Sequence, residues 1–137
     1  MTRFDADDAK ERRKLVADAV AAHRERGSAF LTAEVDPDAD LDGADEDGYA
    51  NPAPWIQFAD DTFNLDVTDD ERADLESLLN DYQEFRIDAM ESPEDADGTN
   101  VRITARSDAN RLSAFVDEAF QAVYGRGEGY RLWVTQV

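Results

Sequence analysis

The run WIQFADDTFNLDV, residues 55–67, decides the fold of this chain. Its two halves, residues 55–59 and 62–67, are rich in the aromatic and apolar residues that are typical of β-strands. Between them stands Asp60-Asp61, and this spacing predicts a two-residue hairpin turn. The centre of the chain is therefore predicted to form two neighbouring antiparallel strands.

A helix is predicted directly after the hairpin. Thr68-Asp69-Asp70-Glu71 has the form of a capping box, in which the first and fourth side chains satisfy backbone N–H groups at the start of a helix. The apolar residues that follow recur at helical spacing. We therefore expect a helix with Leu75, Leu78, Leu79 and Tyr82 on its inner face.

Residues 81–90 fit two structures. Phe85 and Ala89 are four positions apart, so they could continue the preceding helix. Apolar and charged residues also alternate from Phe85 onwards, as they do in a half-exposed strand. We favour the strand, because it gives residues 101–106 a partner across the intervening loop.

The two ends of the chain add helices and strands. Residues 5–26 carry apolar residues at helical spacing, and Gly27 is a suitable stop. Residues 28–35 alternate between apolar and more polar types, which predicts a strand. Either Ser107 or Asp108 caps a further helix with a broad apolar stripe, and this helix ends at Gly125.

The predicted order of elements is α-β-β-β-α-β-β-α. This order predicts a single α+β domain over residues 1–137, with three helices and an antiparallel sheet of about five strands. Residues 36–54 are predicted to form an acidic loop. Tyr130–Val137 is either a sixth strand or a docked tail.

The charge of the chain is strongly unbalanced. Thirty-three Asp and Glu residues face 14 Lys and Arg residues, which gives a net charge of -19, and only Lys10 and Lys14 are lysines. Such a charge repels itself in dilute buffer, whereas in molar salt the Debye length falls to about 3 Å. The composition therefore indicates a halophilic protein of a salt-filled cytoplasm.

Composition also argues against several classes of function. The chain has no Cys, which removes disulfides, thiolate nucleophiles and Cys-ligated zinc. We expect no membrane association, because the sequence has neither a signal peptide nor an apolar run of about 18 residues. Nucleic acid is not an expected partner either, because the chain has no basic stripe to neutralise phosphates.

The run LSAFVDEAFQAVYG, residues 112–125, together with the order of elements, resembles the type III secretion chaperone-like fold. The similarity is to the stand-alone bacterial domains of that group, and the composition resembles uncharacterised protein families of haloarchaea. This resemblance implies a protein-binding module, often a homodimer, without catalytic residues. The acidic insertion at residues 36–48 and the strand at 130–137 depart from the pattern.

Asp38, Asp40 and Asp42 are the candidate metal ligands. With Gly43 they reproduce the first half of an EF-hand loop, whose converging oxygens suit Ca²⁺. Tyr49 stands where that loop needs a bidentate Glu, and such runs arise easily in so acidic a chain. We therefore favour a hydrated loop and no cofactor, with calcium as the alternative.

Arg86, Arg102 and Arg106 are the candidate polar binding residues. If their apolar neighbours face the core, the three arginines share the opposite face of the sheet. Arginine can bind a carboxylate or phosphate with two parallel hydrogen bonds. The alternative is that they are ion-paired to nearby carboxylates such as Asp66 and Asp88 and bind no ligand.

Trp55 and Trp133 are the candidate apolar contacts, since they lie near predicted strand ends. No catalytic set is recognisable in the sequence. We therefore expect a non-enzymatic protein-binding or chaperone-like module that contacts a partner protein or forms a homodimer. The alternative is a small-molecule or anion-binding domain, possibly an enzyme, that uses the same three arginines.

The charge predicts a salt-dependent stability. We expect the midpoint of thermal unfolding to rise by about 5 °C or more between low-salt buffer and molar potassium chloride, because salt screens the repulsion among carboxylates. Circular dichroism at the two salt concentrations measures this shift. Equal midpoints would contradict the halophilic interpretation.

Overall fold

The computed structural model describes residues 3–27, 30–36, 54–92 and 98–136. Within these ranges the chain forms three helices and seven strands. In chain order the elements are β1 (Arg3–Ala6), α1 (Ala9–Arg26), β2 (Leu31–Val35), β3 (Trp55–Ala59), β4 (Thr62–Val67), α2 (Asp69–Leu79), β5 (Arg86–Glu91), β6 (Thr99–Thr104), α3 (Ala109–Ala122) and β7 (Leu132–Gln136).

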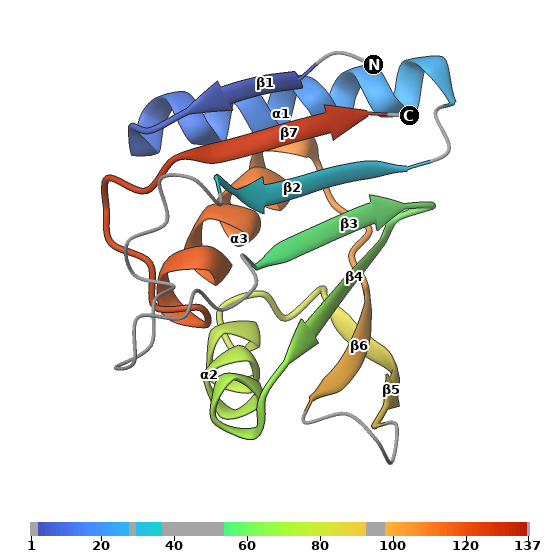
Figure 1. Cartoon of the computed structure of the whole chain (residues 1–137). Coiled ribbons are helices and arrows are strands. Elements are labelled where there is room, and N and C mark those ends of the chain that lie inside the picture. The colour runs from blue at the N-terminus through green and yellow to red at the C-terminus, as the bar shows by residue number, and fades with distance from the viewer. Residues whose placement is uncertain (1–2, 28–29, 37–53, 93–97, 137) are drawn as a thin grey trace.

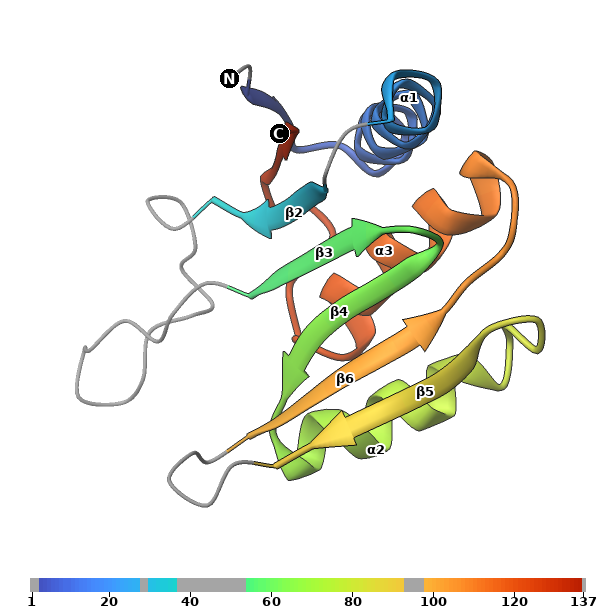
Figure 2. The ribbon, with the colours of Figure 1, turned by 90° about the vertical axis from the view of Figure 1, so that its right-hand side faces the viewer.

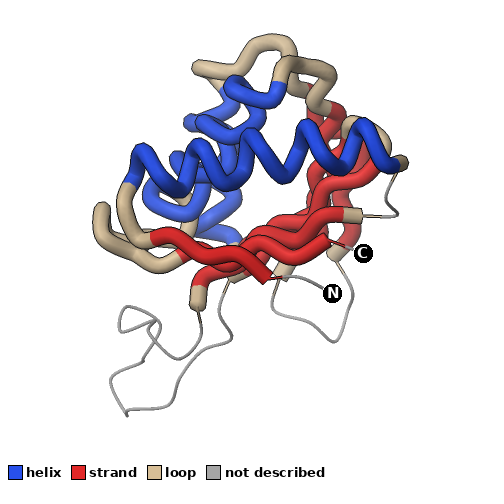
Figure 3. The backbone as a smooth tube through the Cα atoms, turned by 90° about the horizontal axis from the view of Figure 1, so that it is seen from above, coloured by secondary structure: helices blue, strands red, loops and turns tan. Residues whose placement is uncertain are grey.

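The strands form one antiparallel sheet in the order β1-β7-β2-β3-β4-β6-β5 (Figure 1). The sheet twists strongly, so that β1 and β5 run in different directions (Figures 1 and 2). All three helices lie on the same side of it (Figure 3). The protein is therefore an α+β fold, as the sequence predicts, and its helices form one layer on the sheet (Figure 3).

The local predictions around the central hairpin are confirmed. β3 and β4 pair through Asp60-Asp61, whose φ angles of 51° and 59° are the left-handed values that a tight hairpin turn requires. The capping box of α2 also forms. Glu71 donates its backbone N–H to the Thr68 hydroxyl at 3.2 Å, and Thr68 donates its own to the Glu71 carboxylate at 2.9 Å.

The sheet is larger than the five strands predicted. β1 includes Asp5 and Ala6, which we assigned to the start of the first helix, and this helix instead begins at Ala9 with Asp8 as its N-cap. A four-residue strand carries almost no local signal, and it forms because β7 offers a free edge. The C-terminal segment is a strand rather than a docked tail, and it inserts between β1 and β2.

The ambiguous segment after α2 is a strand, as we favoured. β5 pairs antiparallel with β6, but the register shifts between Ile87 and Ala89. Simple alternation predicts that Ala89 lies on the core face. The bulge instead moves Ala89 opposite Arg102, on the other face of the sheet. Met90 takes the core-facing position opposite Val101.

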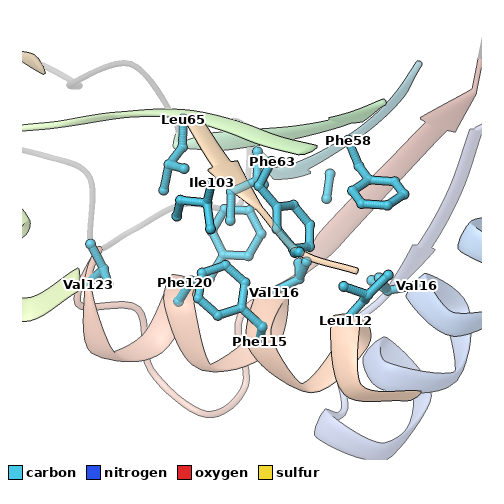
Figure 4. Packing of buried hydrophobic residues seen from close by; sticks show 14 of the residues in the cluster. Val16, Phe58, Phe63, Leu65, Ile103, Leu112, Phe115, Val116, Phe120 and Val123 are labelled. Atoms are coloured by element: carbon cyan, nitrogen blue, oxygen red, sulfur yellow. The ribbon is translucent and has the colours of Figure 1, made fainter. Parts of the chain in front are cut away.

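α3 forms the centre of the hydrophobic core. Its stripe of Leu112, Phe115, Val116 and Phe120 is almost fully buried between the other helices and the sheet (Figure 4). Phe115 contacts Phe63 of β4, with ring centroids 5.1 Å apart. Burial of each such side chain stabilises the fold by about 2 kcal/mol, so this helix holds the layers together.

A charged network is buried between α1 and α3. Arg12 is 0% exposed, and its Nε donates to the Asp117 carboxylate at 2.8 Å. The same guanidinium donates to the backbone carbonyls of Glu128 and Tyr130 at 2.7 and 2.9 Å. Tyr130 stacks on it and donates its hydroxyl to Asp117. The network thus joins α1, α3 and the turn that leads into β7.

Replacing Arg12 should destabilise the fold. We expect Arg12→Met to lower the free energy of unfolding by about 3–5 kcal/mol, because it removes the buried cation beside Asp117 and leaves this carboxylate only the half-exposed Arg13, at 3.4 Å. Arg12→Met/Asp117→Leu should lose less than the single variant, since no charge is then buried alone. Chemical denaturation measures both.

Arg72→Met is the matched control, because Arg72 forms an exposed ion pair with Glu76 on α2. It should change the free energy of unfolding by less than about 1 kcal/mol. Similar losses for Arg12→Met and Arg72→Met would show that the buried pair has no special role.

Three tyrosines are held in their neutral form. Burial raises the pKa of Tyr82, Tyr124 and Tyr130 well above the ordinary value near 10. Nearby carboxylates raise the pKa of each further, for example Glu118 beside Tyr82 and Asp117 beside Tyr130. The hydroxyl protons are also fixed by hydrogen bonds, as in the Tyr124 donation to the Asp66 carbonyl at 2.6 Å.

These shifts predict alkaline unfolding. Above about pH 10 the unfolded chain releases tyrosine protons that the folded chain retains, so the free energy of unfolding falls as pH rises. Thermal unfolding between about pH 8 and 12, with tyrosinate absorbance in parallel, measures the effect. Tyr124→Phe should make the decline shallower, and ionisation of all tyrosines near pH 10 in the folded protein would contradict the prediction.

Candidate functional site

One face of the sheet is left uncovered by the helices (Figures 2 and 3). Along β2, β3, β4 and β6, buried residues alternate with more exposed ones, because successive side chains point to opposite sides of a strand. We call the uncovered side the open face. Its residues include Thr32, Glu34, Trp55, Gln57, Thr62, Asn64, Asp66, Arg86, Asn100, Arg102, Thr104, Trp133 and Thr135.

The centre of the open face is poor in charge. The strand register aligns Thr135, Thr32, Gln57 and Asn64 in one row across β7, β2, β3 and β4. All four side chains are neutral and partly exposed. The row is uncharged in a chain with 34% charged residues, and depletion of charge is typical of the centre of a protein interface.

A second row combines tryptophan and carboxylate side chains. Glu34 lies directly between Trp133 on β7 and Trp55 on β3. β3 and β4 are antiparallel, and Ile56 pairs with Leu65, so the next residue of β4, Asp66, is opposite Trp55. Asp66 and Glu34 therefore lie on the two strands that flank Trp55.

The arginines lie on the same face, near the edge of the sheet that β5 and β6 form. Arg102 on β6 is aligned with Asn64, and Arg86 on β5 is aligned with Thr104. Both side chains are exposed. Arg106 lies two positions beyond the end of β6 and is exposed too. The structure thus brings Arg86 and Arg102 together on adjacent strands, while Trp55 and Trp133 lie on β3 and β7.

No carboxylate among the described residues forms an ion pair with Arg86, Arg102 or Arg106. The two carboxylates that we considered as partners are engaged elsewhere. Asp66 accepts a hydrogen bond from Asn100 at 2.9 Å, and Asp88 accepts one from the Thr104 hydroxyl. Other arginines are paired, for example Arg24 with Asp61 and Arg111 with Glu84. The described part of the chain therefore contains none of the ion pairs that the alternative of ion-paired arginines expects.

The described residues form an apolar cavity and no metal-binding cluster. A small cavity next to Val20, Phe58 and Val116 is lined by apolar side chains alone, so it provides no polar group to orient a substrate. Among the described residues, no cluster of three His, Asp or Glu side chains could hold a metal ion. Asp38, Asp40 and Asp42 lie outside the described residues.

The sequence analysis did not single out Glu34, which the structure places between Trp133 and Trp55. The alternation in residues 28–35 could have placed this side chain on the outer face of its strand. That Trp133 lies beside it depends on β7 pairing with β2, and no local pattern contains this information.

The fold and its surface define a class of α+β protein in which one face of an antiparallel sheet is covered by helices and the other is open. None of the described helices combines the length and apolar character needed to cross a membrane. The chain belongs to a family of unknown function (DUF7975), whose model matches residues 1–137. No curated protein and no solved structure gives a significant match.

Proposed function

We propose that this chain is a non-enzymatic protein-binding module whose partner contacts the open face. The charge-poor row of Thr135, Thr32, Gln57 and Asn64 carries the proposal. An acidic protein gains solubility from surface carboxylates, so a neutral strip on its sheet needs a separate reason, and contact with another protein is one.

The residues around this row supply the other components of an interface. Trp55 and Trp133 add partly exposed aromatic area, and tryptophan and arginine are the residues that most often dominate binding energy. Arg86 and Arg102 have no ion-pair partner among the described residues, so they can donate hydrogen bonds to a partner. The open face thus combines a neutral centre with aromatic and charged contacts at its margins.

The setting that we propose is a halophilic, haloarchaeal cytoplasm, in keeping with the charge of -19. The resemblance to the type III secretion chaperone-like fold supports a binding role. The predicted order α-β-β-β-α-β-β-α, on which this resemblance rests, runs from α1 to α3, and β1 and β7 are added at the two ends.

An affinity experiment in molar potassium chloride tests the proposal. The tagged chain, carried through native-type lysate, should retain a stoichiometric protein partner that Arg86→Glu/Arg102→Glu loses by tenfold or more, because the variant reverses two charges on the open face. Quantitative mass spectrometry compares the two. Lys10→Glu/Lys14→Glu is the matched control, since it makes the same change of charge on the exposed side of α1.

Equal recovery with the open-face variant and the α1 variant would contradict the proposal. The second candidate is a small-molecule or anion-binding domain, possibly an enzyme, and it is favoured by Arg86, Arg102 and Arg106, which form no ion pair with a described carboxylate. Phosphate would then raise the unfolding temperature of the wild type and not that of Arg86→Glu/Arg102→Glu.

A further inference from the structure

We propose that the open face binds a second copy of this chain, with Arg102 of each copy lying on Trp55 of the other. The inference rests on the proposed protein-binding function and names its partner. It follows from two unlike patches on the same face: the arginine pair Arg86 and Arg102, and an acidic-aromatic patch formed by Glu34, Trp55 and Asp66.

The two patches are chemically complementary. A guanidinium group stacks on an indole ring and at the same time donates hydrogen bonds to carboxylates beside that ring. Trp55 has a carboxylate on each neighbouring strand, Glu34 on β2 and Asp66 on β4. This arrangement suits an incoming arginine, and the chain itself carries two exposed arginines that pair with no described carboxylate.

The positions of the patches fit a two-fold dimer. In such an interface, residue i of one copy contacts residue j of the other, and j contacts i in return. Trp55 lies on β3 and Arg102 on β6, with only β4 between them. An axis over β4 therefore exchanges the two patches between copies. Two sheets packed face to face in this way are a common arrangement.

The open-face residues next to that axis lie on β4. A residue on a two-fold axis meets its own copy, so a charged side chain there needs an opposite charge from the other copy. The open-face residues of β4 between Trp55 and Arg102 are Asn64, which is neutral, and Asp66, which the proposal places against Arg102 of the other copy. The proposal thus accounts for the acidic-aromatic patch and for the two arginines that pair with no described carboxylate.

Charge reversal tests the inference. We expect the wild type in molar potassium chloride to show twice the mass of the 15.3 kDa chain by sedimentation equilibrium. Arg86→Glu/Arg102→Glu and Glu34→Arg/Asp66→Arg should each dimerise about thirtyfold or more weakly, because each places like charges in contact. An equimolar mixture of the two variants should dimerise again, since opposite charges then meet in both contacts.

Circular dichroism must show that each variant is folded. Where Glu34→Arg/Asp66→Arg does not fold, Asn64→Asp replaces it, because it keeps the oxygen that accepts from Asn100 and adds a charge near the axis. Asn64→Asp should weaken the dimer, whereas Lys10→Glu/Lys14→Glu should not.

A wild type that stays monomeric would overturn the inference. If it still captures a different protein that Arg86→Glu/Arg102→Glu loses, the protein-binding proposal stands and only the second copy is wrong. Dimerisation that survives both reversals, or a mixture of the variants that remains monomeric, would also overturn the inference.

Discussion

The buried ion pair between Arg12 and Asp117 is the constraint on which the rest of the structure depends. Each charge would be very unfavourable alone in the core, so α1 and α3 are held in the one alignment that brings them together. The same guanidinium binds the carbonyls of Glu128 and Tyr130, and this fixes the turn before β7. The network therefore anchors the segment that leads into β7.

The placement of β7 decides what the open face contains. Because β7 inserts beside β2, Trp133 lies next to Glu34 and the neutral row continues from Asn64 to Thr135. The helices gather their apolar sides on the opposite face, where α3 fills the core (Figure 4). The network that stabilises one side of the sheet therefore also arranges the surface on the other side, which we propose as the binding surface.

Much of the fold could be predicted because its signals are local. The Asp60-Asp61 turn, the capping box at Thr68 and the apolar stripe of α3 each depend on residues a few positions apart. β1 could not be predicted, because a four-residue strand forms only when a partner edge is present. The bulge in β5 was missed for a similar reason, since pairing with β6 sets it rather than the pattern of β5 itself.

The sequence by itself determined the charge, the α+β class and the sharing of one sheet face by Arg86 and Arg102, because side chains alternate along any strand. Only the tertiary structure decided that Trp55 stands between Glu34 and Asp66, and that Arg12 is buried against Asp117. Arg12 and Asp117, for example, are separated by 105 positions in the chain. Their pairing is set by packing of the whole fold, and no local pattern of residues contains it.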